Sequence, residues 1–559
     1  MRKLAILTAV LAILPFAKSE ACTNFIITRG ASTDGSVMVT YAADSHTLYG
    51  ALYKYNRPAQ PYGKGSMIPV YEWDSGRFLK NIPQVAQTWN TVGNVNEHQV
   101  MIGETTYGGR KELVDPDGKM DYGSMIYLTL QRAKTAREAI DIMVDLANTH
   151  GYASSGESFS VADKNEAWIL EIIGKGSKLN KKGENVNKGI VWVARRIPDG
   201  YVSAHANHAR ITQFPMNDPE NCIFSKDVIS FAREMGYFNG KDEEFSFSDT
   251  YAPLDFSGMR GCEARVWAFF RTVADGMEKY EDYAMGHNPK NRMPLWVKPK
   301  AKISPKQVFD CMRDHYEGTP MDMTTDIGAG GEECPYRWRP MNFEVDGVTY
   351  VNERATATQQ TGFWFVSQAR NWLPDPVGCI LWFGVDDAAT SSLTPIYGSI
   401  TDVPWCFSTE NGDMVTYSPT SAFWLYNRVA QFAYLRYNVV GKYVRNEVDK
   451  WENARLAGIK AIDDEAAALY KESPEKAVRF LTDYSLRTAQ EMFRTWEELD
   501  RYIMVRFKDG NNMKVDGDNR FIRDEWGMPV FPDQPGYTEK WKRAVIEDNG
   551  ETLRQWDVK

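Results

Sequence analysis

A cysteine that opens a strand directly after an apolar leader constrains this chain more than any other sequence feature. Two basic residues precede an apolar run from 4 to 16, and small side chains stand at Ser19 and Ala21. This order of regions is typical of a secretory signal peptide, and the run is shorter than the roughly 20 apolar residues that span a bilayer. The sequence therefore predicts cleavage directly before Cys22.

Cleavage at this position would leave a thiol and a free α-amine on the same residue, Cys22. A thiolate is a strong nucleophile, and an α-amine with a pKa of about 8 can take up the thiol proton at neutral pH. We therefore predict that residues 1–21 are a signal peptide, that Cys22 is the nucleophile and that the protein is periplasmic or secreted. Lipidation of the cysteine is the competing interpretation, but lipoprotein signals favour a leucine-like residue at Ser19 and a small one at Glu20.

The residues that follow the cysteine predict a β-hairpin. Residues 23–28 and 36–42 are rich in apolar and β-branched side chains, and the turn pair Asp34-Gly35 lies between them. Antiparallel pairing about this turn sets Cys22 opposite the first residues after the second strand, where Asp44 stands. The Asp44 carboxylate would hold the protonated α-amine, and the alternative is that it only begins a turn.

The remaining patterns predict an α+β fold with antiparallel sheets. Helical periodicity between 122 and 148 is followed by four strand-like segments that end at 204, whereas residues 50–84 are rich in Tyr, Pro and Gly and are expected to be irregular. From 421 the apolar spacing becomes almost wholly helical. The predicted units are a catalytic domain over 22–420, a helical extension packed on it over 421–506, and an irregular C-terminal tail over 507–559.

Composition bears on the classes of partner. The formal net charge is −9, and loss of residues 1–21 removes three basic residues and one acidic residue, which leaves −11. An acidic chain argues against a nucleic acid partner, and no later stretch is apolar enough to span a membrane. The sequence leaves a homo-oligomer open.

The cysteines and histidines give no metal motif. The six cysteines after Cys22 would allow up to three disulfides in an oxidising compartment, without a readable pairing, and they are Cys222, Cys262, Cys311, Cys334, Cys379 and Cys406. None forms a CxxC pair, and His205 and His208 lack a companion carboxylate at ligand spacing. No metal and no other cofactor is predicted.

Taken together, these features resemble the PepD-type cysteine dipeptidases, a branch of the Ntn hydrolases related to bile salt hydrolases and penicillin V acylases. The resemblance spans residues 22 to about 400 and implies a four-layered αββα fold. It rests on the runs Ala21-Cys22-Thr23-Asn24, Asp34-Gly35-Ser36, Asp44-Ser45, Asn96-Glu97, Gly103-Glu104-Thr105-Thr106, Glu166-Ala167-Trp168-Ile169-Leu170-Glu171, Ala206-Asn207 and Tyr336-Arg337-Trp338-Arg339-Pro340.

The resemblance also implies the roles of individual residues. It places the exposed nucleophile at Cys22, the family carboxylate at Asp44 and the asparagine on the oxyanion side at Asn207, which as a strand-end residue would otherwise belong to a turn. A second oxyanion group aligns near Thr106, through its backbone N–H or its hydroxyl. Arg265 matches a second family arginine.

One departure and two further carboxylates concern the substrate. The arginine that precedes the family aspartate appears here as Tyr41, which changes how the thiol and substrate are positioned. A dipeptide also requires a carboxylate for its amine, and Glu104 and Asp326 are the candidates, each otherwise a surface or turn residue.

The implied function is hydrolysis of a small peptide through a thioester on Cys22. The first alternative keeps this chemistry but acts on bile-acid or N-acyl amides, because the loops rich in Trp and Tyr also suit a large apolar acyl group. The second alternative belongs to another class, an exported ligand-binding lipoprotein in which the cysteine has no catalytic role.

Overall fold

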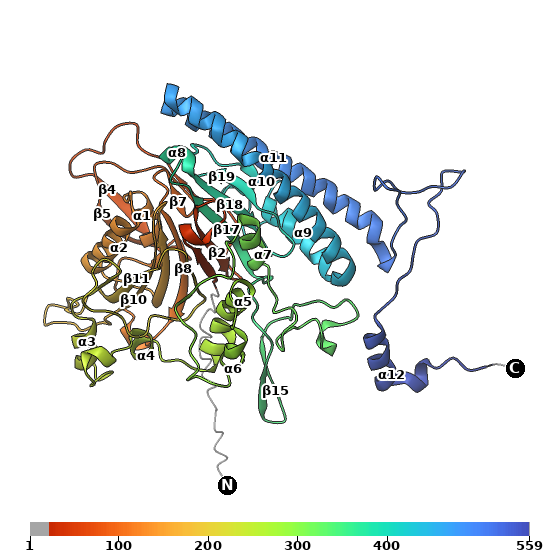
Figure 1. Cartoon of the computed structure of the whole chain (residues 1–559), viewed down its shortest axis with the longest axis horizontal. Coiled ribbons are helices and arrows are strands. Elements are labelled where there is room, and N and C mark those ends of the chain that lie inside the picture. The colour runs from red at the N-terminus through yellow and green to blue at the C-terminus, as the bar shows by residue number, and fades with distance from the viewer. Residues whose placement is uncertain (1–21, 558–559) are drawn as a thin grey trace, which may run out of the picture.

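Two large antiparallel sheets form the centre of the molecule (Figure 1). The computed structural model describes residues 22–557, so the predicted signal peptide lies outside the described residues. In spatial order the first sheet contains β14 (Trp296–Val297), β12 (Val202–His205), β1 (Asn24–Ile27), β2 (Val37–Asp44), β17 (Thr361–Ala369), β18 (Cys379–Val385) and β19 (Thr394–Tyr397). The second contains β13 (Cys222–Phe224), β11 (Ile190–Arg196), β10 (Ala167–Gly174), β9 (Gly156–Ala162), β8 (Met101–Gly108), β7 (Val95–Asn96), β6 (Thr91–Val92) and β3 (Lys54–Tyr55).

The two sheets pack face to face. Strand β2 of the first sheet contacts β8 and β9 of the second. Every residue of β2, β9 and β10 is buried, so neither face of these strands is exposed to solvent. The predicted α+β class with antiparallel sheets is confirmed.

Helices cover the outer faces of both sheets. Helices α1 (Tyr122–Leu130) and α2 (Ala136–His150) pack on the second sheet. Helices α5 (Ala264–Val273) and α7 (Pro305–Cys311) pack on the first. The order of layers is therefore helix, sheet, sheet, helix. The Thr135 hydroxyl caps α2 by accepting from the Glu138 N–H, and Gly151 ends it with a φ of 81°.

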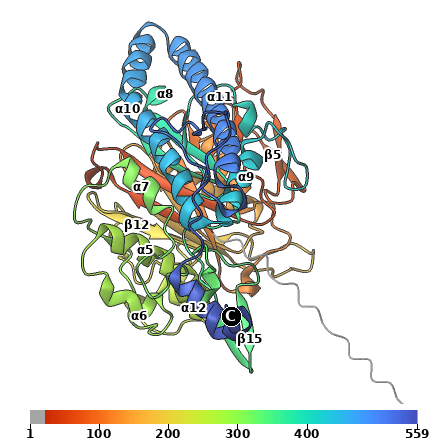
Figure 2. The ribbon, with the colours of Figure 1, turned by 90° about the vertical axis from the view of Figure 1, so that its right-hand side faces the viewer.

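Three further helices lie over the edge of the first sheet. They are α9 (Ala422–Tyr434), α10 (Lys442–Glu472) and α11 (Pro474–Phe507). Helices α10 and α11 form a long pair that faces the viewer in Figure 2, and α11 packs against β19. The predicted C-terminal helices are thus present. Shorter helices are α3 (Val228–Glu234), α4 (Phe247–Tyr251), α6 (Glu281–Ala284) and α8 (Asp375–Gly378).

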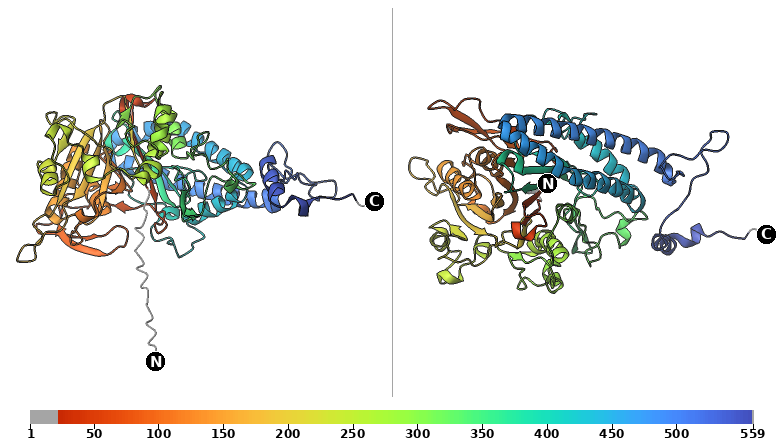
Figure 3. Two further views of the ribbon diagram at one scale, coloured as in Figure 1. Left: turned by 90° about the horizontal axis from the view of Figure 1, so that it is seen from below. Right: turned by 45° about the horizontal axis from the view of Figure 1, so that its top comes forward.

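Two segments expected to be irregular contain regular elements. Strands β4 (Met67–Tyr71) and β5 (Phe78–Pro83) form a separate hairpin in which Val70 and Ile82 are buried, although residues 50–84 are rich in Tyr, Pro and Gly. A further hairpin, outside the two segments expected to be irregular, joins β15 (Asn342–Val345) and β16 (Val348–Val351). Helix α12 (Glu539–Leu553) lies in the C-terminal tail, which extends away from the sheets (Figure 3).

Two chemical features of the whole chain complete the description. All seven cysteines are free thiols, so the disulfides that their number allows are not formed. Between residues 22 and 557, no helix is both long enough and apolar enough to cross a membrane.

Candidate active site around Cys22

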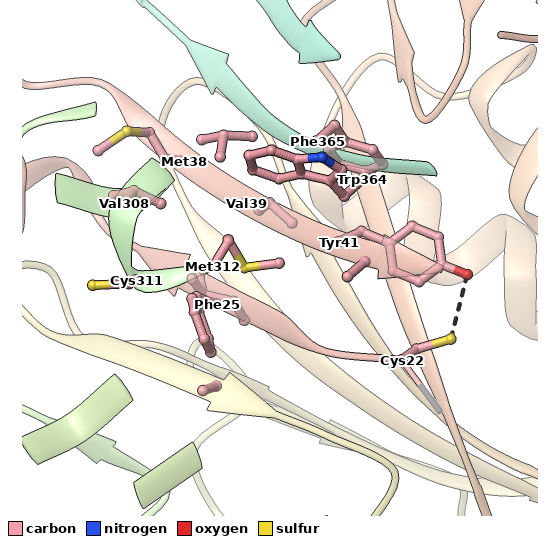
Figure 4. Packing of buried hydrophobic residues seen from close by; sticks show 14 of the residues in the cluster. Cys22, Phe25, Met38, Val39, Tyr41, Val308, Cys311, Met312, Trp364 and Phe365 are labelled. Atoms are coloured by element: carbon pink, nitrogen blue, oxygen red, sulfur yellow. Dashed lines mark hydrogen bonds between the residues drawn. The ribbon is translucent and has the colours of Figure 1, made fainter. Parts of the chain in front are cut away.

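Cys22 lies directly before β1, at the end of the predicted hairpin. The pairs Ile26–Val39 and Thr23–Ala42 fix the antiparallel register, which confirms the hairpin and sets Cys22 beside the end of β2. The cysteine is only 5% exposed. Figure 4 shows its side chain directed at the Tyr41 hydroxyl, which lies 3.7 Å from Sγ.

The thiol lies within a buried acidic cluster. Its Sγ is 3.6 Å from Glu104 Oε1, and the Tyr41 hydroxyl also donates to that carboxylate oxygen. Burial raises the pKa of Glu104 to about 7, although the hydrogen bond from Tyr41 acts to lower that pKa. Burial also raises the pKa of the Cys22 thiol, and the charges of Glu104 and Asp44 raise it further. The thiol therefore needs a base before it can attack.

Asp44 is held by residues from a distant part of the chain. It accepts a hydrogen bond of 2.6 Å from the Thr361 hydroxyl and forms an ion pair with Arg354. Burial raises the pKa of the Asp44 carboxyl, and the Arg354 charge opposes that shift. A hydrogen bond from the Asp44 backbone lowers the pKa of the Cys22 thiol, so this aspartate lies beside Cys22, as the hairpin predicts.

Arg265 joins Cys22 to the end of β12. Its Nη1 donates to the Cys22 carbonyl at 2.5 Å and to Thr23 Oγ1 at 2.8 Å. Its Nη2 donates to the Ala206 carbonyl at 3.2 Å and to Asn207 Oδ1 at 2.9 Å. Because the guanidinium is buried, these bonds fix Cys22 and Asn207 relative to each other.

Asn207 and Thr106 connect the two sheets. Asn207 has a φ of 60°, a left-handed conformation that asparagine adopts more readily than most residues. Its Nδ2 donates to the Thr106 carbonyl at 2.8 Å, and the Thr106 hydroxyl donates to Glu157 at 2.6 Å. Both predicted oxyanion residues therefore lie together, in one hydrogen-bond network with Arg265.

Asp326 belongs to a different part of the surface. Its carboxylate accepts from Arg337 at 2.8 and 3.0 Å, and it caps the Gly328 N–H at 2.6 Å. Its side chain is 57% exposed. Of the predicted site residues, Asp326 alone lies apart from the others. The residues that the structure brings together are Cys22, Tyr41, Asp44, Glu104, Thr106, Asn207 and Arg265.

Sequence reasoning missed three residues of this cluster, namely Glu157, Arg354 and Thr361. Arg354 is 310 residues away from Asp44 and Thr361 is 317 residues away, so no local spacing links them.

In the part of the chain that the structure describes, no group of three or more His, Cys, Asp or Glu side chains is arranged to hold a metal ion.

Comparisons with known proteins place the chain in a family. The model of peptidase family C69 matches residues 21–450. A protein named "Probable dipeptidase" from Latilactobacillus sakei is 24% identical over 471 residues, which cover 80% of this chain and 89% of the relative. "Dipeptidase A" from Lactobacillus helveticus is 23% identical over 469 residues, with coverage of 80% and 88%. A "Probable dipeptidase" from Salmonella dublin is 24% identical over 405 residues, with coverage of 69% and 82%. The chain belongs to peptidase family C69, as its sequence resemblance predicts.

Proposed function

We propose that this protein is an exported dipeptidase of the Ntn-hydrolase type, with Cys22 as its nucleophile. The observation that carries the proposal is the buried Cys22 thiol at the end of a hairpin, in contact with Tyr41 and Glu104. The family match and the names of the similar proteins support the reaction class. Periplasmic or secreted localisation is supported by the signal-like composition of residues 1–21.

The first step requires a free α-amine on Cys22. Cleavage before this residue would produce the amine, which accepts the thiol proton as the sulfur attacks the scissile carbonyl. Burial raises the thiol pKa, so an intramolecular base is needed at neutral pH. Collapse of the tetrahedral intermediate expels the leaving amine, which takes a proton from the Cys22 ammonium, and leaves a thioester. The same amine then activates a water molecule that hydrolyses the thioester.

Asn207 and Thr106 would stabilise the oxyanion. The Asn207 amide lies at the end of a strand and is held by Arg265. The Thr106 hydroxyl already donates to Glu157, so we assign the oxyanion contact to the Thr106 backbone N–H. Loss of one such donor reduces kcat by about 10²–10³-fold in known enzymes.

Glu104 is the carboxylate we assign to the substrate amine. It lies 3.6 Å from the sulfur, so an α-ammonium next to the attacked carbonyl would fall within its reach. Asp326 is a poorer choice, because Arg337 already neutralises it. Tyr41 occupies the position of the family arginine and orients the thiol and Glu104 through one hydroxyl.

An amide hydrolase for bulky acyl groups is the second candidate function. A pocket beside the nucleophile is lined by aromatic rings, with Tyr41, Tyr53, Tyr55, Trp73 and Tyr127 among them. This aromatic lining suits an apolar part of a substrate.

A kinetic comparison of substrates tests both functions. Purified mature protein is assayed with a panel of dipeptides, with conjugated bile salts and with penicillin V. We expect the highest kcat/KM for dipeptides, and loss of activity in Cys22→Ser but not in the control Cys406→Ser. Full activity of Cys22→Ser would remove the nucleophile from the mechanism, and a preference for bile salts or penicillin V would favour the acylase.

A further inference from the structure

The side chains around the Asp44 carboxylate carry more positive than negative charge. Arg354 pairs with Asp44, and Arg265 and Arg339 both lie near enough to act on its charge. The neighbouring carboxylate of Glu353 is already bound in a bidentate pair by Arg260, with one bond of 2.8 Å. One aspartate is thus the counter-ion for three guanidinium groups.

A pocket opens on this cationic region. Its lining includes His46, Arg339, Arg354 and Gln360, and its cavity volume is about 30 Å³. Arg354 and Gln360 are buried, whereas His46 and Arg339 are exposed. The pocket therefore extends from exposed residues inward to Arg354, which forms the ion pair with Asp44.

Arg339 is the cation in this pocket without an acidic partner. Within residues 22–557, no carboxylate oxygen lies within 4.0 Å of its guanidinium, which donates instead to the Gln360 side chain. Partial desolvation and the Arg354 charge lower the pKa of Arg339 to about 10. Desolvation also lowers the pKa of His46, and the charges of Arg339 and Arg354 lower it further. Cations that repel one another in this way are stabilised by a bound anion.

We propose that this pocket binds the free α-carboxylate of the second residue of a dipeptide, with Arg339 as the principal contact. The inference rests on the proposed function. In a dipeptide that carboxylate is attached to the Cα next to the scissile nitrogen, so it must lie close to the nucleophile and Asp44. Arginine recognises a carboxylate through two parallel N–H donors, which gives the contact both strength and direction.

This assignment explains how one site can select dipeptides. A longer peptide has an uncharged peptide group where a dipeptide has its carboxylate, and an N-acyl amide such as penicillin V presents different geometry there. Burying an arginine against a neutral group forfeits a charge-assisted hydrogen bond worth about 1.5–3 kcal/mol, which corresponds to about 10- to 100-fold in kcat/KM. The arginine pocket and the Glu104 carboxylate would then recognise opposite ends of the same substrate.

The test compares Leu-Ala with its C-terminal amide, Leu-Ala-NH₂, on wild-type protein and on Arg339→Gln. We expect wild-type kcat/KM to be about 10- to 100-fold higher for Leu-Ala, with most of the difference in KM. Arg339→Gln should lose this preference by weakening Leu-Ala alone and leaving the amide unchanged. Arg520→Gln, in the exposed C-terminal tail, is the matched control and should behave as wild type.

Arg339→Lys separates recognition of charge from damage to the fold. It keeps a cation without the planar fork, so it should recover part of the lost affinity for Leu-Ala. Equal losses for Leu-Ala and its amide in Arg339→Gln, or no loss for either, would overturn the proposal while leaving dipeptide hydrolysis intact. A wild-type protein that hydrolyses neither compound, nor any other dipeptide, would instead refute the proposed function and this inference with it.

Discussion

Replacing Glu104 by glutamine should change how the stability of the protein depends on pH. Burial raises the pKa of this carboxyl from 4.5 to about 7 in the folded protein. The folded state therefore binds the proton more tightly than the unfolded state. The stabilisation from the protonated carboxyl is complete below pH 4.5 and is lost as the pH rises to about 7.

The size of the effect follows from the shift in pKa. At 1.36 kcal/mol for each pKa unit, the wild-type free energy of unfolding should fall by about 3 kcal/mol between pH 4.5 and pH 8 because of Glu104 alone. Glu104→Gln keeps a side-chain oxygen for the Tyr41 hydroxyl but cannot ionise. The variant should lose this part of the pH dependence.

Urea denaturation of both proteins at pH 5 and pH 8 measures the difference. The free energy of unfolding of Glu104→Gln minus that of wild type should be about 2–3 kcal/mol larger at pH 8 than at pH 5, so the variant gains stability relative to wild type as the pH rises. Glu234→Gln, at an exposed position, is the control and should show no such change. A difference between Glu104→Gln and wild type that is the same at both pH values would refute a raised pKa for this carboxyl.

Two other substitutions test the network around the nucleophile. Arg265→Ala leaves the buried carbonyls of Cys22 and Ala206 without their donor. We therefore expect the free energy of unfolding, measured in urea, to fall by about 3 kcal/mol, and kcat to fall by at least about 100-fold. A variant with the stability and kcat of wild type would contradict this role of Arg265. Tyr41→Phe removes a hydrogen bond that lowers the Cys22 pKa, so the rise of kcat/KM with pH should move to higher pH, with about a tenfold loss at pH 7. An unchanged pH profile would show that the hydroxyl does not act on the thiol.

Local sequence signals predicted the elements that position Cys22. The turn pair Asp34-Gly35 and the flanking β-branched residues specify the hairpin, and the hairpin places Asp44 beside Cys22. The helical periodicity between 122 and 148 similarly predicted α1 and α2. In each case the decisive interactions join residues close together in the chain.

Long-range contacts could not be predicted in this way. Arg354 reaches Asp44 across 310 residues, and no period or motif in the sequence connects the two positions. Sequence reasoning also proposed Asp326 as a carboxylate for the substrate amine. Arg337, 11 residues later, neutralises this carboxylate, and no sequence motif indicates that the two side chains pair. The β4–β5 hairpin was missed because buried Val70 and Ile82 stand among prolines and exposed polar residues that mask the strand pattern.

The N-terminus of the mature protein tests the central claim most directly. Intact mass spectrometry of the exported protein, before and after reaction with a thiol-reactive probe, identifies both the first residue and the reactive cysteine. We predict a chain that begins at Cys22 and carries a label on Cys22, and this label is absent from Cys22→Ser. An active chain that begins before Cys22 would contradict the account, because the cysteine would then have no free α-amine to act as the base.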